Sequence, residues 1–140
     1  MSWKPLLKKY GFKGEARQTA HEKHELDGYS FASGLERDVY LHLKMLMRAG
    51  EISEIKCQVT INITKYIRWR PDFECKDIEG NVFYVEAKGY PTEVWDLKKK
   101  AYKEFGKHIL YVFIRYGKDQ VTIKETIFPE NAYETLKGPT

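Results

Sequence analysis

Cysteine and long apolar runs are both scarce in this chain of 140 residues. The two cysteines, Cys57 and Cys75, belong to no Cys-x-x-Cys pair, which argues against a disulfide framework and against a structural zinc site. No apolar run approaches the ~20 residues that a membrane-spanning helix needs. The first residues also lack the apolar stretch and the cleavage site of a signal peptide. We therefore expect free thiols, no membrane partner and a cytoplasmic protein.

Neither sign of charge dominates the composition. The chain has 24 Lys and Arg against 20 Asp and Glu, a net charge of +4. Such a mild basic excess is compatible with a polyanionic partner such as DNA, although many globular proteins share it. The length suits one domain with its own core. Residues 1–27 are polar and basic with little periodicity, and a turn signal at Asp27-Gly28 follows. These residues are either an arm that tracks a phosphate backbone or a solvated terminus.

A first helix is predicted to start at Ser33. The sequence Ser33-Gly34-Leu35-Glu36 fits the capping box, in which the Ser hydroxyl and the Glu carboxylate satisfy free N–H groups at a helix start. Apolar residues at helical spacing then predict a helix to about Arg48, with Gly50 as its stop. These apolar residues are Leu35, Val39, Leu43, Leu46 and Met47. Glu36 thus has a complete structural explanation, and any chemical role must compete with it.

The remaining apolar patterns predict strands. Gln58–Thr64 alternates apolar and polar residues, which is typical of a half-buried strand. Ile109–Ile114 is an unbroken apolar run, which predicts a strand buried on both faces and paired in parallel. Val121–Ile127 alternates again and is expected at a sheet edge, and residues 130–137 are expected to form a short helix. We expect a mixed sheet with one covered face and one polar face.

A second helix is predicted from Glu93 to Phe105, after a cap at Thr92 and with its end at Gly106. Its expected inner stripe is Val94, Leu97, Ala101 and Phe105. Lysines cover much of the rest of the helix, namely Lys98, Lys99, Lys100 and Lys103. A solvated face explains such a run as well as contact with DNA does.

Residues 70–89 are predicted to form an acidic hairpin around the turn-forming segment 77–81. With period two, the charged face carries Tyr66, Arg68, Arg70, Asp72, Glu74, Glu86 and Lys88. Trp69 has the opposite parity and is expected in the core rather than as a platform for base stacking. A loop of three or five residues would place Asp72 across from Lys88 or Glu86. A salt-bridge network would explain this face equally well.

The motifs Pro71-Asp72 and Glu86-Ala87-Lys88, with thirteen residues between Asp72 and Glu86, resemble the signature of the PD-(D/E)XK nuclease superfamily. Residues 33–36, 71–73 and 85–89 resemble, in the same order, the phage endonuclease I type of four-way-junction resolving enzyme. Residues 86–102 also resemble other phage nucleases of this superfamily. The resemblance implies an α/β fold with a restriction-endonuclease-like core over residues 28–116: a helix, a three-stranded meander, a helix and a strand around a central mixed sheet. Residues 117–140 would then be an appended strand and short helix.

The resemblance also implies a set of site residues. Asp72, Glu86 and the carbonyl of Ala87 would bind Mg²⁺, with Mn²⁺ as a substitute, because hard oxygen ligands suit these ions. Glu36 would reach toward a second metal or its water, and Lys88 would position the attacking water. The expected DNA contacts are Arg68, Arg70, Lys98, Lys99 and Lys100.

The expected function is therefore hydrolysis of DNA phosphodiester bonds that leaves 5′-phosphate and 3′-hydroxyl ends. By resemblance, the substrate would be branched DNA such as a four-way junction, the enzyme a homodimer, and the source a phage acting in the cytoplasm of its host cell. Two alternatives stay open. The protein would be a phage nuclease for nicking, replication or recombination with other DNA selectivity, or a non-catalytic DNA-binding module on a nuclease fold.

Overall fold

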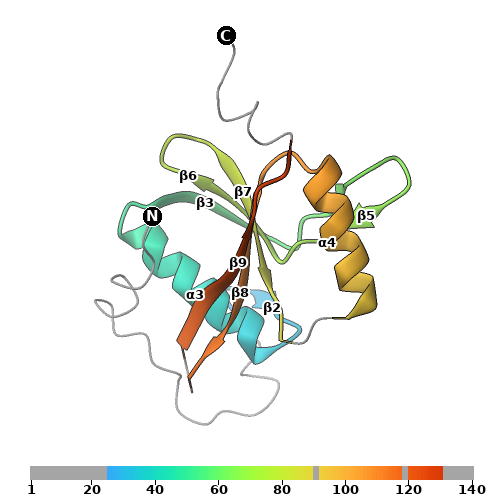
Figure 1. Ribbon diagram of the computed structural model, residues 1–140. Coiled ribbons are helices and arrows are strands. Elements are labelled where there is room, and N and C mark those ends of the chain that lie inside the picture. Colours follow the sequence, from blue (N-terminus) through green and yellow to red (C-terminus); the bar gives the residue numbers. More distant parts are fainter. Residues whose placement is uncertain (1–24, 90–91, 118–119, 131–140) are drawn as a thin grey trace.

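The computed structural model describes residues 25–89, 92–117 and 120–130. Their central element is a five-stranded mixed sheet with the strand order β3-β6-β7-β8-β9 (Figure 1). The strands are β3 (Ile52–Cys57), β6 (Phe73–Asp77), β7 (Val82–Ala87), β8 (Ile109–Tyr116) and β9 (Gln120–Ile127). β7 and β8 pair in parallel, and the other neighbours pair antiparallel. The expected mixed α/β architecture with a central mixed sheet is confirmed.

Two short hairpins accompany the sheet. β1 (Glu25–Leu26) pairs with β2 (Tyr29–Ser30), and β4 (Ile61–Asn62) pairs with β5 (Arg68–Trp69). The predicted turn at Asp27-Gly28 joins β1 to β2, and both residues have positive φ, at 52° and 81°. Two-residue hairpin loops favour this conformation because its twist matches that of the flanking strands.

Helix α3 (Gly34–Arg48) covers one face of the sheet, as its apolar stripe predicts. The Ser33 hydroxyl accepts a hydrogen bond from the Glu36 N–H at 3.1 Å and so caps the helix. The helix contributes Val39, Tyr40, Leu43 and Leu46 to a core cluster with Phe73, Cys75, Phe83, Val85 and Phe113 from the strands. Cys57 and Cys75 are free thiols, as expected.

Helix α4 (Glu93–Phe105) covers the opposite face (Figure 1), so the prediction of one polar sheet face is wrong. The Thr92 cap and the end at Gly106 are confirmed, but of the predicted inner stripe only Ala101 packs on the core. Val94 and Leu97 are 61% and 68% exposed, and Phe105 is also exposed. Trp95 and Tyr102 face inward instead and join a second core cluster with Trp69, Tyr84, Leu110 and Val112. The two large aromatic rings, seven residues apart, fill the space over the sheet, so Val94, Leu97 and Phe105 face outward.

The strand predicted at Gln58–Thr64 is also wrong. The strand next to β6 is β3, and it ends at Cys57. Gln58 has a φ of 58°, a left-handed conformation that interrupts an extended chain. Only Ile61 and Asn62 of the predicted stretch form a strand, and they pair with β5 outside the main sheet. The alternating pattern therefore marked a short hairpin that packs on the second core cluster rather than a sheet strand.

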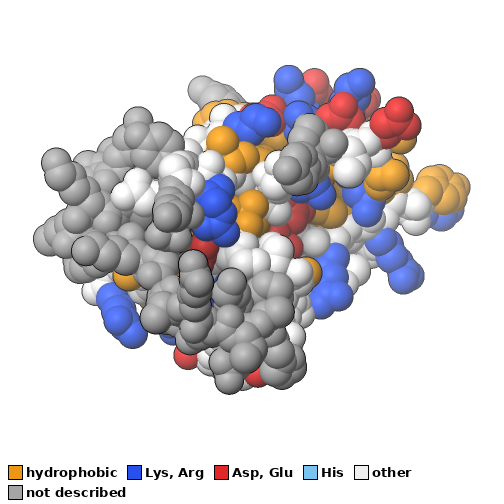
Figure 2. All heavy atoms as spheres, turned by 90° about the horizontal axis from the view of Figure 1, so that it is seen from below, with side chains coloured by type: hydrophobic (Ala, Val, Ile, Leu, Met, Phe, Trp, Pro, Cys, Tyr) orange, Lys and Arg blue, Asp and Glu red, His pale blue; other side chains and the backbone are white. Residues whose placement is uncertain are grey.

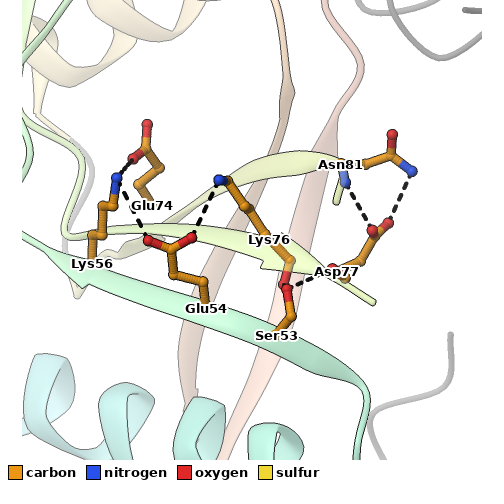
Figure 3. Close-up of polar contacts among 7 residues, drawn as sticks. All are labelled: Ser53, Glu54, Lys56, Glu74, Lys76, Asp77 and Asn81. Atoms are coloured by element: carbon orange, nitrogen blue, oxygen red, sulfur yellow. Dashed lines mark hydrogen bonds and ion pairs between the residues drawn. The ribbon is translucent and has the colours of Figure 1, made fainter. Parts of the chain in front are cut away.

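The predicted hairpin is formed by β6 and β7, and the five residues from Asp77 to Asn81 span the loop between the last paired residues. The Asp77 carboxylate accepts hydrogen bonds from the N–H groups of Glu79 and Asn81, both at 2.9 Å, and so fixes the loop. Figure 3 shows a ladder of alternating charge on β3 and β6, in which Glu54 lies between Lys56 and Lys76 and Lys56 also reaches Glu74. A salt-bridge network therefore does account for part of the charged hairpin face.

The last two strands match their predictions. β8 pairs in parallel with β7, and β9 is the outer strand of the sheet beside β8. Val112 pairs with Glu125 and Phe113 with Ile123, so Lys124 is an extra residue in β9, a β-bulge. The bulge switches the parity of β9, because Ile123 packs with the first core cluster and Ile127 with the second. The helix predicted at residues 130–137 lies almost wholly outside the described residues, as does most of the predicted arm. No described helix is long and apolar enough to cross a membrane.

Candidate metal and catalytic site

Asp72 and Glu86 meet at the end of the hairpin. Phe73 pairs with Val85, so the same register places Asp72 across from Glu86, one of the two arrangements that the sequence allowed. One Asp72 carboxylate oxygen accepts a hydrogen bond from the backbone N–H of Ala87 at 2.8 Å. This contact orients the Asp72 side chain toward the end of β7, where Glu86 lies. Glu86 itself is buried.

Glu36 joins Asp72 from the first turn of α3. Its carboxylate accepts a hydrogen bond from the Ala32 N–H at 3.0 Å, so the predicted cap role is confirmed, although the donor is the residue before the N-cap. The same carboxyl is buried and lies within electrostatic and hydrogen-bonding reach of Asp72. The cap and the acidic site are therefore compatible roles of one side chain.

The electrostatics of the site favour protonated acids. Burial is the main cause that raises the pKa of Glu86, and hydrogen bonding to Asp72 and its charge add to the effect. Burial and the charge of Asp72 likewise raise the pKa of Glu36 to about 7. Two carboxyl groups hydrogen-bond to each other only when one of them carries a proton. The positive charge of Lys88 lowers the pKa of Glu86 but does not offset the effects of burial and of Asp72.

Trp69 also belongs to this site, although counting alternate residues along the predicted strand did not place it there. Its indole N–H donates a hydrogen bond to Glu86 at 3.0 Å, and its ring is buried in the second core cluster. The predicted core position is confirmed, but the predicted parity is wrong. Trp69 lies in β5, and β6 begins only at Phe73, so period-two counting does not carry across the intervening residues.

Gln58 is a second residue that sequence patterns missed. Its N–H donates to the Asp72 carbonyl at 2.9 Å, and its side chain accepts a hydrogen bond from Arg70 at 2.7 Å. The Gln58 side-chain amide donates to the Ser30 carbonyl at 3.2 Å and lies close enough to Glu36 to lower the pKa of that carboxyl. A positive φ at a residue of ordinary helical or strand propensity leaves no sequence signal, and only the fold brings Gln58 between the two acidic elements.

Lys88 follows the acidic residues at the end of the sheet. Its positive charge opposes the rise in the pKa of Glu86, so its ammonium lies within electrostatic reach of that carboxyl. The ammonium lies 5.0 Å from the centre of the Trp95 ring, a cation–π contact that limits where the side chain can go. Its backbone N–H is bound to the Phe113 carbonyl, which fixes this end of β7 against β8.

The predicted DNA contacts divide into separate places. Arg68 and Arg70 are exposed, and Arg70 is tied to Gln58 beside the acidic residues. Lys99 and Lys100 line a groove between α4 and β9, whereas Lys98 does not. Glu74 also lies on the predicted charged face. Its carboxylate forms an ion pair with Lys56 and accepts a hydrogen bond from the Tyr84 hydroxyl at 3.3 Å. It therefore stands apart from the acidic site.

The donor groups suit a hard divalent cation, although within residues 25–89, 92–117 and 120–130 no three Asp, Glu, His or Cys side chains converge closely enough to hold an ion unaided. Asp72 instead raises the pKa of both Glu36 and Glu86, so it lies within electrostatic reach of each of them. Buried carboxyls with raised pKa values are groups that a bound cation would stabilise in their charged form. The Ala87 carbonyl, next to Glu86, would add a further oxygen ligand.

Figure 2 looks onto the face at which α3 begins and β7 ends, and acidic side chains are visible near its middle with basic side chains around them. The site itself is built from the start of α3, the end of β7 and the segment before β6. No protein-family model, curated protein or solved structure matches this chain.

Proposed function

We propose that the protein is a metal-dependent endodeoxyribonuclease whose active site is formed by Glu36, Asp72, Glu86 and Lys88. The observation that carries this proposal is the position of Asp72 between two buried acids that come from separate elements, α3 and β7. A fold rarely places two buried acids beside a third acid for stability, because each carboxylate raises the cost of ionising the next. Such an arrangement is common at sites that bind a cation or transfer a proton.

The residues would share the chemistry as follows. Asp72, Glu86 and the Ala87 carbonyl would hold Mg²⁺ or Mn²⁺, and Glu36 would reach toward a second metal or its water. When bound, the metal would polarise the phosphodiester and lower the pKa of a coordinated water. Lys88 would orient the attacking water and offset the charge that develops on the phosphorus oxygens. Trp69 holds Glu86 in place through its indole N–H, so that one carboxylate oxygen stays turned toward the core.

The finer parts of the proposal rest on the resemblance of the motifs. The core would be of the restriction-endonuclease type, and the substrate would be branched DNA such as a four-way junction. Symmetric cutting of two strands requires two active sites, so the active form would be a homodimer. Arg68 and Arg70 would contact phosphates that flank the scissile bond, because both are exposed and Arg70 is held beside the acids by Gln58.

A cleavage assay tests this function. The purified protein is incubated with an end-labelled four-way junction and with a linear duplex of the same arms, in Mg²⁺, in Mn²⁺ and in chelator. The proposal expects metal-dependent cleavage of the junction with 5′-phosphate ends and slower cleavage of the duplex. Cleavage of both substrates at equal rates would keep the nuclease and reject the branched selectivity. No metal-dependent cleavage of any DNA would reject the nuclease.

One observation favours the alternative, a DNA-binding module without catalysis. Each acid also has a structural partner: Ala32 for Glu36, Ala87 for Asp72 and Trp69 for Glu86. Under this alternative, the protein would bind DNA with the same affinity in metal and in chelator and would cut none of the substrates.

A further inference from the structure

A groove of about 410 Å³ lies between α4 and the end of β9. Lys99, Lys100 and Lys103 line it from the helix, and Glu125, Thr126 and Phe128 line it from the strand and the residues that follow. A volume of several hundred Å³ is the size of a site for one small ligand or one nucleotide. None of the acids of the proposed active site lines this groove.

The β-bulge at Lys124 builds one wall of the groove. Because the bulge reverses the parity of β9, Glu125 faces α4, and its carboxylate forms an ion pair with Lys99 at 3.2 Å. Lys99 is also 3.9 Å from Asp96. The ion pair between Lys99 and Glu125 joins the helix to the outer strand. The net positive charge of the groove therefore comes from Lys100 and Lys103.

Lys100 and Lys103 supply this charge. Across the described part of the chain, no carboxylate lies within ion-pair distance of either ammonium group. The groove therefore carries three lysines against one glutamate. An excess of two positive charges in a concave surface favours a ligand with negative charge, such as a phosphodiester backbone.

Phe128 supplies a flat apolar surface at the same place. Its side chain is 63% exposed although it lines the groove, so most of the ring is available to a ligand. The chain is held there because the Glu130 N–H donates a hydrogen bond to the Lys103 carbonyl at 3.1 Å. An aromatic ring beside lysines is the combination that proteins use to bind single-stranded nucleic acid, with bases stacked on the ring and phosphates held by the cations.

We propose that this groove binds an unpaired segment of DNA, with a base stacked on Phe128 and the adjoining phosphates held by Lys100 and Lys103. The assignment of DNA as the ligand rests on the proposed nuclease function. α4 begins five residues after Lys88, and the groove lysines lie roughly 9–15 Å along the helix from its start. A strand that leaves the acidic site can therefore follow α4 to the groove within a few nucleotides.

The test is DNA binding measured by fluorescence anisotropy in chelator, so that no strand is cut. The probes are a labelled oligo-dT and a labelled duplex. Phe128→Ala should weaken oligo-dT binding at least about five-fold and duplex binding less than about two-fold, because base stacking needs an unpaired base. Phe128→Tyr should restore the lost affinity. Ile78→Ala, which truncates a similarly exposed residue in the β6–β7 loop, should leave both affinities unchanged.

The double variant Lys100→Gln, Lys103→Gln tests the phosphate contacts. It should weaken binding of oligo-dT and reduce the slope of log affinity against log salt by about one to one and a half. Lys56→Gln, whose ammonium is already paired with Glu54 and Glu74 on the far edge strand, is the matched control and should change neither. Circular dichroism verifies that each variant is folded.

Wild-type binding of oligo-dT by both groove variants would overturn the inference. A loss that is equal for duplex and oligo-dT in Phe128→Ala would also overturn it, because stacking of an unpaired base would not explain that loss. Failure of the nuclease proposal looks different: the protein would cut no DNA in metal, while the groove variants would still lose oligo-dT binding relative to their controls.

Discussion

The indole N–H of Trp69 donates a hydrogen bond to the Glu86 carboxylate at 3.0 Å, and the two residues come from different sheets. Trp69 packs between Trp95, Tyr102 and Tyr84, with ring centres 5.1–6.3 Å apart. The aromatic core on the α4 side of the sheet therefore ends in a polar contact with the acidic site. Packing in this core and the position of Glu86 are coupled through one hydrogen bond.

We predict that Trp69→Phe lowers DNA cleavage at least about ten-fold, as does loss of other groups that orient metal ligands. The variant should also lose about 1–3 kcal/mol of unfolding free energy, because Glu86 loses a buried partner. Tyr102→Phe is the control, since Tyr102 is buried in the same cluster against Trp69 but its hydroxyl donates to the His108 carbonyl rather than to Glu86. Cleavage by Trp69→Phe at the rate of Tyr102→Phe would show that the contact with Glu86 has no functional role.

Glu36→Gln separates the cap role of this residue from its chemical role. The amide oxygen of Gln can still accept from the Ala32 N–H, so the unfolding free energy should change by less than about 0.5 kcal/mol. Cleavage should be abolished. Ser33→Ala should do the reverse, with a loss of about 0.5–2 kcal/mol from the missing cap and cleavage that stays near wild type. A fully active Glu36→Gln protein would return Glu36 to a structural role alone.

The pH dependence of stability reports on Glu86. Its pKa is raised to about 10 in the fold, so the folded protein holds a proton that the unfolded chain releases near pH 4.5. The resulting stability is complete at acid pH and is lost as pH rises toward 10. Glu86 is the main contributor between pH 7 and 8.5. The pKa of Glu36 is only about 7 and that of His42 about 4, and the thiols of Cys57 and Cys75 contribute mainly above this range, because a free thiol ionises near pH 9.

In chelator, the melting temperature should therefore fall by at least about 4 °C between pH 7 and 8.5. Glu86→Gln cannot ionise and should remove most of this fall. Saturating Mg²⁺ should reduce it in the wild type, because a cation can replace the proton. Differential scanning fluorimetry measures all three. A fall of the same size in Glu86→Gln would assign the pH dependence to other groups.

The two sides of α4 give a test of the fold itself. Tyr102 is buried and Leu97 is 68% exposed, in contrast to the stripe that the sequence predicts. Tyr102→Ala should cost about 3–5 kcal/mol of unfolding free energy in urea titrations, because it empties a large core position. Leu97→Ala should change it by less than about 0.5 kcal/mol, as for most surface substitutions. Equal losses in the two variants would mean that the inward face of α4 is assigned wrongly.

Local signals predicted the parts of the fold that depend on the nearest residues. The turn at Asp27-Gly28, the caps at Ser33 and Thr92 and the loop after Asp77 each follow from a side chain that satisfies its own backbone. The register that sets Asp72 across from Glu86 follows from the length of that loop. The sequence left Lys88 and Glu86 open as partners of Asp72, and the observed register selects Glu86.

Long-range packing decided the features that were predicted wrongly. In α4, Trp95 and Tyr102 are buried against Trp69, whereas Val94, Leu97 and Phe105 of the predicted stripe are exposed. Ile52–Cys57 has no clean alternation, because β3 is an edge strand with an ion-pair ladder on its exposed side. The contacts of Trp69 and Gln58 with the acids depend on how the segment between β3 and β6 folds back against the sheet, which no local sequence pattern predicts.

Asp72→Asn tests the central claim most directly. Strand cleavage of a four-way junction is measured in Mn²⁺ for Asp72→Asn and for Glu74→Gln, a control from the same hairpin that stands apart from the acidic site. We expect Asp72→Asn to lose at least about a thousand-fold in rate while its junction affinity in chelator stays at the wild-type value, and Glu74→Gln to cleave at a rate near the wild type. Cleavage by Asp72→Asn at the rate of Glu74→Gln would contradict the account.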